Sequence, residues 1–144
     1  MGRAPQTGVD PLDTGFTRDG FAALARQARG AIKTWLMDQR RLAGLGNIYA
    51  AEALFQAGIH PRRVGATLSR PRLDRLHGAI VRVLRAAVQS ASLAYQRPGG
   101  FANGELFDPA VYGREGQPCP RCGRPIRRIA QGGRSTYFCP GCQR

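Results

Sequence analysis

Four cysteines near the end of the chain have the spacing that points most directly to chemistry. They form two Cys-x-x-Cys pairs, Cys119 with Cys122 and Cys139 with Cys142, and sixteen residues separate the pairs. Two thiolates in one tight turn can bind the same ion, and two such turns joined by a hairpin supply four tetrahedral ligands. The pattern predicts one structural Zn²⁺, because a closed four-sulfur site leaves zinc no open position for a substrate.

Two disulfides or a redox-active dithiol are the alternatives for the same cysteines. A reducing compartment opposes disulfides, and the lack of an adjoining βαβ pattern opposes a thioredoxin-like dithiol. Short β-prone stretches around residues 126–129 and 136–138 predict a zinc-ribbon hairpin. Because the segment has few apolar residues, we expect metal binding to supply most of its folding free energy.

Two turns have the composition of phosphate sites. Gln131-Gly-Gly-Arg134 brings Arg134 to a hairpin tip, where its guanidinium could contact phosphates or a minor groove; a merely solvated arginine is the alternative. Gly44 and Gly46 form a turn between two helices, and Asn47 opens the second helix. Free backbone N–H groups and the helix dipole favour an anion there, although Asn47 could also serve as a helix cap alone.

The charge of the chain favours a polyanionic partner. Its 144 residues include 22 Lys+Arg and 9 Asp+Glu, a formal net charge of +13. All of these cations except Lys33 are arginines, whose planar guanidinium suits two-pronged contacts to phosphate. This composition favours nucleic acid over the alternative of a solvated basic surface. No apolar run is long enough for a membrane span and no secretion signal is evident, so we expect a cytoplasmic protein, nucleoid-associated if bacterial.

Hydrophobic periodicity predicts four helices that must position these groups. The first begins at a Thr17 cap and ends near Gln27, and the second carries the buried stripe of Ile32, Trp35 and Leu36. The third covers residues 47–57. The fourth follows a Ser69 cap and has one apolar face. Its opposite face carries arginines, for which DNA contact and simple solvation both stay open; they are Arg72, Arg75, Arg82 and Arg85.

Changes in composition divide the chain into four segments of a mostly α protein. A tail or linker covers residues 1–16, a helical DNA-binding domain 17–94, a loop-like connector 95–112 and a zinc-ribbon finger 113–144. We expect a long ordered connector to be functional.

Three stretches, AIKTWLMDQRRLAGLGNIYAAEALFQAGIHP, VYGREGQPCPRCGRPI and GGRSTYFCPGCQR, resemble the C-terminal half of the Fpg/Nei family of DNA glycosylases. The resemblance is nearest to the formamidopyrimidine-DNA glycosylase branch. It implies a helix-two-turn-helix domain and a zinc finger that clamp damaged double-stranded DNA. It also implies that Asn47 and Arg134 hold the phosphates beside an extruded nucleotide, with Lys33 toward the lesion. A further segment resembles the loop that covers a flipped base; it consists of Arg97, Pro98, Gly99, Gly100 and Phe101.

The resemblance also bears on catalysis. The chemistry of that family resides in an N-terminal β-rich domain that begins Met-Pro-Glu, whereas this sequence begins Met1-Gly2-Arg3. We therefore expect no catalytic residue here, and a chain that is inactive alone or takes a catalytic half from another chain or from a longer gene product. Lys33 could form a Schiff base if desolvated, although a solvated lysine is its default. His60 and His77 have no evident acid or nucleophile partner and are expected to be structural.

The leading hypothesis is a monomeric protein that binds damaged duplex DNA in base excision repair. The resemblance attaches oxidised-purine excision and AP lyase activity to the family. Residues 89–93, Gln-Ser-Ala-Ser-Leu, depart from a Gly-Gly-Thr-Thr-like stretch of the family, so the sequence leaves the lesion preference open. The alternative is a zinc-ribbon protein that binds RNA or another protein without a role in repair.

Overall fold

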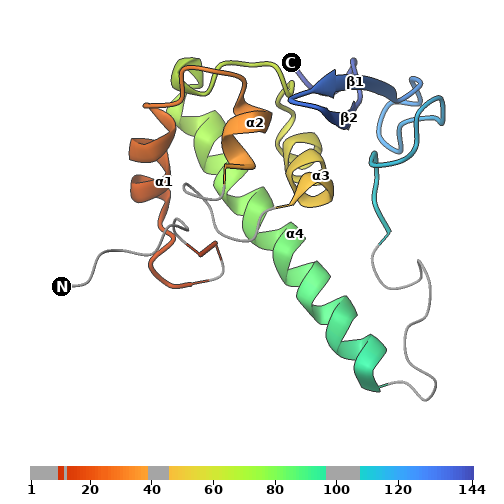
Figure 1. The fold of residues 1–144 in the computed structure, drawn as a ribbon, viewed down its shortest axis with the longest axis horizontal. Helices are drawn as coiled ribbons and strands as arrows, with labels where there is room; N and C mark the ends of the chain where they lie inside the picture. The colour runs from red at the N-terminus through yellow and green to blue at the C-terminus, as the bar shows by residue number, and fades with distance from the viewer. Residues whose placement is uncertain (1–9, 12, 39–45, 97–107) are drawn as a thin grey trace.

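Within residues 10–11, 13–38, 46–96 and 108–144, which the computed structural model describes, helices are followed by one antiparallel hairpin. Figure 1 shows the helices grouped around the longest of them, with the hairpin beside the third. The elements are α1 (Arg18–Ala25), α2 (Ile32–Leu36), α3 (Asn47–Ala57), the 3-10 helix η1 (Gly65–Thr67), α4 (Arg70–Gln96), β1 (Arg127–Gln131) and β2 (Arg134–Phe138). The predicted fold class, mostly α with a small β-hairpin, is confirmed.

Local sequence signals set the helix ends. The Thr17 hydroxyl accepts a hydrogen bond from the backbone N–H of Gly20 at 3.0 Å, so it caps α1 as expected. The helix α3 covers residues 47–57, as predicted, and ends at Gly58, whose φ of 73° suits glycine better than a residue with a Cβ. The helix α4 follows Ser69 and extends to Gln96, two residues beyond the predicted end of the helical domain.

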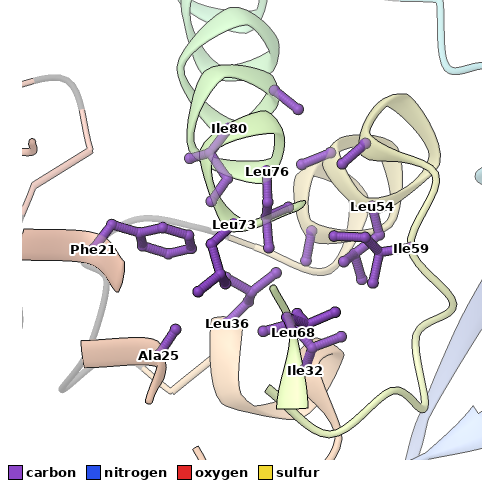
Figure 2. Packing of buried hydrophobic residues seen from close by; sticks show 14 of the residues in the cluster. Phe21, Ala25, Ile32, Leu36, Leu54, Ile59, Leu68, Leu73, Leu76 and Ile80 are labelled. Carbon is purple, nitrogen blue, oxygen red and sulfur yellow. The ribbon is translucent and has the colours of Figure 1, made fainter. Parts of the chain in front are cut away.

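The main hydrophobic core lies where α4 crosses the other helices. Figure 2 shows Leu73, Leu76 and Ile80 of α4 close to Leu36 of α2 and Leu54 of α3. The side chains of Leu36, Leu54, Leu76 and Ile80 have no exposed area. Full burial of such a side chain contributes about 1.5–3 kcal/mol. The predicted apolar face of α4 is therefore confirmed, and among the described helices none is both long and apolar enough to cross a membrane.

A second apolar cluster lies on the opposite side of α3. It joins Ala51 and Phe55 of α3 to Val111, Cys119, Ile126 and Cys139 of the C-terminal segment. Most of α3 is therefore buried, including Glu52, and its many alanines let the neighbouring segments approach closely. The helix α3 thus belongs to two cores at once.

Arg72 of α4 departs from the predicted outward-facing row because it is partly buried against the end of α3, whereas Arg82 stays exposed. The guanidinium of Arg72 donates to the carbonyl oxygen of Gly58 at 3.1 Å and to that of Arg144, while Nε of Arg82 donates to Oε1 of Gln56 at 3.2 Å. Helical period alone cannot show this, because long side chains reach around a helix and the last carbonyl groups of α3 need partners. Arg75, Arg82 and Arg85 are exposed, as expected.

Close packing around η1 yields a prediction about stability. A Cβ added at Gly65 would lie 2.6 Å from the Cβ of Ala28 and 3.3 Å from Cδ1 of Ile32. We expect Gly65→Ala to lower the free energy of unfolding by about 1–3 kcal/mol, measured by chemical denaturation of the zinc-loaded protein. Gly30→Ala is the control, because no atom lies within 4 Å of its added Cβ. Equal effects of the two substitutions would contradict this account.

Candidate nucleic-acid interface and metal centre

The four predicted cysteine ligands come together in the C-terminal segment. All four sulfur atoms lie within 4.8 Å of one another, with Cys119 Sγ 3.8 Å from Cys142 Sγ and Cys122 Sγ 3.4 Å from Cys139 Sγ. A disulfide would need about 2.05 Å. Tetrahedral zinc with bonds of about 2.3 Å places its sulfur ligands about 3.8 Å apart. The geometry therefore fits one structural Zn²⁺ and not two disulfides.

The four thiols are close enough to shift one another's pKa values. Burial disfavours the thiolate of Cys119, but the backbone N–H groups of Cys122 and Arg121 hydrogen-bond to its sulfur and bring its pKa down to about 7. Burial and the neighbouring cysteines raise the pKa of Cys142 to about 12. Four thiolates this close repel one another unless a cation is present. Zinc, when bound, supplies the positive charge that offsets this repulsion and cross-links the two Cys-x-x-Cys turns.

Glu52 of α3 attaches the zinc-binding segment to the helical domain. Its side chain is almost fully buried and accepts three backbone hydrogen bonds. Oε1 accepts from Ala110 N at 2.7 Å, and Oε2 accepts from Val111 N and Tyr112 N, both at 2.9 Å. This residue was missed at the level of sequence patterns. Its signal was a single carboxylate within the otherwise apolar run of residues 50–55.

Two further contacts fix the zinc-binding segment against the end of α3. The buried Gln143 side chain accepts from the Cys139 backbone N–H at 2.7 Å and donates to the Ile59 carbonyl at 3.0 Å. The Arg121 guanidinium donates to the Phe55 carbonyl at 3.2 Å and lies 4.5 Å from the centre of the Phe55 ring. The finger is therefore held in one orientation relative to the helices.

This orientation brings the start of α3 against strand β2. Lys33 Nζ of α2 donates to Asn47 Oδ1 at 2.6 Å and to Thr136 Oγ1 at 2.7 Å. Asn47 Nδ2 in turn donates to the Ser135 carbonyl at 3.0 Å. Three segments far apart in the sequence are thus joined by one polar network, which we call the lysine network: Lys33, Asn47, Ser135 and Thr136.

Lys33 is a buried cation with neutral partners. Its side chain is 1% exposed, and burial together with the nearby charge of Arg134 lowers its pKa to about 8. Both hydrogen-bond acceptors that it has among the described residues are uncharged. A buried charge is stabilised best by an opposite charge. The site is therefore electrostatically suited to an anion.

An open recess of about 330 Å³ lies beside the lysine network. Its lining includes the two cations Lys33 and Arg134, the polar Asn47 and Gln131, and one acidic residue, Asp38. Arg134 is exposed at the hairpin tip, as predicted. It pairs with Gln131 across a two-residue turn, in which Gly132 and Gly133 have φ of 57° and 79°. Two successive positive φ angles are the requirement of a type I′ hairpin turn, which explains the Gly-Gly sequence.

Four of the predicted phosphate-site residues therefore lie together, namely Lys33, Gly46, Asn47 and Arg134. Gly46 is the N-cap of α3, and no side chain caps this helix, so the capping interpretation of Asn47 was wrong. Lys33 is buried, so the default interpretation of a solvated lysine was wrong; its Nζ donates to two acceptors, and the Schiff-base alternative stays a prediction. Gly44 and the loop of Arg97–Phe101 lie outside the described residues.

Both histidines have structural contacts. The His77 ring stacks on Phe16 at 4.4 Å and its Nε2 lies 2.8 Å from the Phe16 carbonyl oxygen. His60 accepts a hydrogen bond at Nδ1 from the Arg62 backbone N–H at 3.0 Å and contacts the Phe138 ring at 4.6 Å. The expectation that they are structural agrees with these contacts.

Fold and cysteine site together define a class of protein: a helix-two-turn-helix domain joined to a four-cysteine zinc finger. Residues 7–97 match the family described as the formamidopyrimidine-DNA glycosylase H2TH domain, and residues 116–144 match the zinc finger found in FPG and IleRS. The chain belongs to the Fpg family of DNA glycosylases.

Individual relatives agree with this assignment. The formamidopyrimidine-DNA glycosylases of Alkalilimnicola ehrlichii and Gluconobacter oxydans are 46% and 45% identical to it, each over 95% of this chain and 50% and 51% of their own lengths. The crystal structure of the MutM (Fpg) protein from Thermus thermophilus has 43% identity and a TM-score of 0.85, covering 96% of this chain and 54% of that one. The Lactococcus lactis Fpg in complex with abasic-site DNA has 34% identity and a TM-score of 0.82, covering 96% and 52%. The chain spans about half the length of these relatives.

The metal centre yields a direct prediction. We expect Cys139→Ser to release the zinc and to unfold the segment after about residue 117, because metal binding supplies the folding free energy that this small core lacks. Metal analysis and the NMR signals of the hairpin measure both effects. Pro140→Ala, next to the ligand but without a ligand atom, is the control. Stoichiometric zinc with an intact hairpin in the serine variant would contradict the four-sulfur site.

The lowered pKa of Lys33 predicts a pH dependence. The folded-state pKa of about 8 lies below the ordinary 10.5, so keeping Lys33 protonated lowers the free energy of unfolding at and below pH 8. This loss of stability disappears as the pH rises toward 10.5. We expect the wild type to gain stability over this window relative to Lys33→Met, by at most about 3 kcal/mol. Denaturation of both proteins from pH 7 to pH 10 measures the difference. A constant difference would show that Lys33 does not titrate there.

Proposed function

We propose that this chain binds double-stranded DNA through the recess beside the lysine network, as the DNA-binding part of a base excision repair protein. The observation that carries the proposal is Lys33, a buried ammonium group whose described partners are both neutral. A backbone phosphate that approaches Asn47 and Arg134 supplies the missing negative charge.

Three kinds of donor converge on such a phosphate. The first turn of α3 directs backbone N–H groups and the positive end of the helix dipole toward the recess. The Asn47 amide has one N–H left after its bond to Ser135. Arg134 adds a two-pronged guanidinium from the hairpin tip. These groups recognise phosphate and carry no base sequence information, which suits a protein that must bind many sequences.

Relatives suggest the kind of DNA. Solved complexes of the Lactococcus lactis Fpg contain an abasic site in one case and a FAPY-dG lesion in another. We infer that this chain prefers duplexes deformed by such damage, since a weakened base pair makes extrusion of a nucleotide easier. Excision of oxidised purines and AP lyase activity then depend on a catalytic half, in the same or another polypeptide. We assign no catalytic role to the described residues, and we place a monomer on bacterial nucleoid DNA in the cytoplasm.

Duplex binding by the zinc-loaded protein tests the proposal. Fluorescence anisotropy compares a duplex of about two helical turns that carries a central abasic-site analogue with the undamaged duplex. We expect tighter binding of the damaged duplex, and a steep loss of affinity with salt because phosphate contacts release counterions. Absence of duplex binding, or an affinity that is indifferent to salt, would contradict the proposal and favour an RNA or protein partner.

Arg134→Ala separates a specific phosphate contact from general charge. We expect it to weaken duplex binding by about 1–3 kcal/mol and to reduce the slope of log K against log salt by about one. Arg127→Ala is the matched control, because this exposed arginine is at the opposite end of the same hairpin, paired with Phe138. If both variants lose the same affinity, Arg134 has no special contact.

Asn47→Ala tests the start of α3. Because no side chain caps this helix, we expect the substitution to weaken duplex binding by about 1–3 kcal/mol, with zinc still bound. Anisotropy and thermal unfolding are measured on the same samples. A large drop in melting temperature with affinity otherwise normal would mean that the residue serves the lysine network alone.

A further inference from the structure

A second basic recess adjoins the one beside the lysine network. It has a volume of about 480 Å³ and is lined by His60, Arg62, Arg63, Val64, Thr67 and Arg144. Pro61, which is buried, lies between residues that line the two recesses. Its carbonyl accepts from Lys33 N at 3.2 Å and from Gln131 Nε2 at 3.3 Å, and both donors belong to residues of the first recess. Its neighbours His60 and Arg62 line the second. We call this second recess the arginine recess.

The loop that forms the arginine recess is held in place by its backbone. The Arg63 carbonyl accepts from Ile32 N at 2.7 Å, and the His60 backbone N–H donates to the Arg144 carbonyl at 3.2 Å. The His60 ring is fixed between the Arg62 N–H and Phe138. These contacts involve the backbone of the loop, and the side chains of Arg62 and Arg63 remain exposed. A site on such a loop is pre-organised, so a ligand need not order it.

No side chain that lines this recess is acidic, and its one negative group, the α-carboxylate of Arg144, is outnumbered by the guanidinium groups of Arg62, Arg63 and Arg144. Arg62, Arg63 and Arg144 are exposed, and no hydrogen bond or ion pair found among the described residues uses their guanidinium groups. Neighbouring groups respond to the accumulated charge. Burial, then Arg62 and Arg63, lower the pKa of His60. Burial, then Arg63 and Arg75, lower the pKa of Arg72.

We propose that the arginine recess is a second DNA-phosphate site, which binds the sugar-phosphate backbone next to the segment held by Asn47 and Arg134. The inference rests on the proposed function and enlarges the surface that contacts DNA. Phosphates follow one another along a strand at about 3.4 Å of rise, so a backbone bound in the first recess continues past the adjoining one. Two exposed guanidinium groups on a fixed loop match the oxygens of a phosphodiester.

The double variant Arg62→Ala with Arg63→Ala tests this assignment. Its affinity for the damaged duplex should fall by about tenfold, and the slope of log K against log salt should fall by about one to two. The matched control is the double variant Arg18→Ala with Arg85→Ala, which removes the same charge from exposed residues that line neither recess. The control should lose less than about threefold, since distant exposed charges are screened by salt. Circular dichroism checks that both variants remain folded.

The outcomes separate this inference from the proposed function. If the wild type binds duplex and Arg134→Ala weakens it, but the Arg62/Arg63 variant matches the wild type or the control, the second site is wrong and the proposed function stands. If the wild type binds no duplex, the proposed function fails as well. Inorganic phosphate distinguishes the ligand source. Saturable NMR shifts of Arg62 and Arg63 with phosphate, without any effect of the double variant on duplex binding, would mean a small-anion site and overturn the proposal.

Discussion

The three hydrogen bonds that Glu52 accepts from consecutive backbone N–H groups are the contact on which the arrangement of the whole molecule depends. They fix the chain at residues 110–112 to the middle of α3, after the long α4 and before the zinc finger. A buried carboxylate is tolerated there because each oxygen has N–H partners. Since α3 also packs into the main core, one helix sets the orientation of the finger relative to the other helices.

The recess beside the lysine network exists because of that orientation. Lys33 and Asn47 come from the helical domain, whereas Thr136 and Arg134 come from the hairpin. Zinc, when bound, stabilises the hairpin, and the hairpin in turn supplies one of the two acceptors of Lys33. A buried ammonium group with uncharged partners costs folding free energy, and its pKa of about 8 reflects this cost. Such a cost is understandable where an anion is to be bound.

Local patterns predicted much of this fold, and long-range contacts account for what they missed. Residues 47–57 were predicted as a helix because Asn47 follows a turn with Gly44 and Gly46 and because Gly58 and Pro61 end the segment. The zinc site followed from ligand spacing alone. Neither signal shows that Asn47 lies against Ser135, because that contact depends on packing between distant segments. The hydrogen-bond partners of Glu52 and Arg72 could not be predicted for the same reason. From sequence patterns, a charged side chain on a helix is predicted to be solvated, because its partners in the folded protein are not known.

Amide hydrogen exchange of Glu52→Gln, with zinc bound, tests the central claim most directly. A glutamine side chain has one oxygen acceptor in place of two, so it must leave an N–H among residues 110–112 without a partner, at a cost of about 1–3 kcal/mol. We predict exchange at Ala110, Val111 and Tyr112 that is faster by about tenfold or more, together with weaker duplex binding. The exposed Glu115→Gln, which removes an ion pair with Arg128, should change neither. Unchanged protection and affinity in Glu52→Gln would contradict the account.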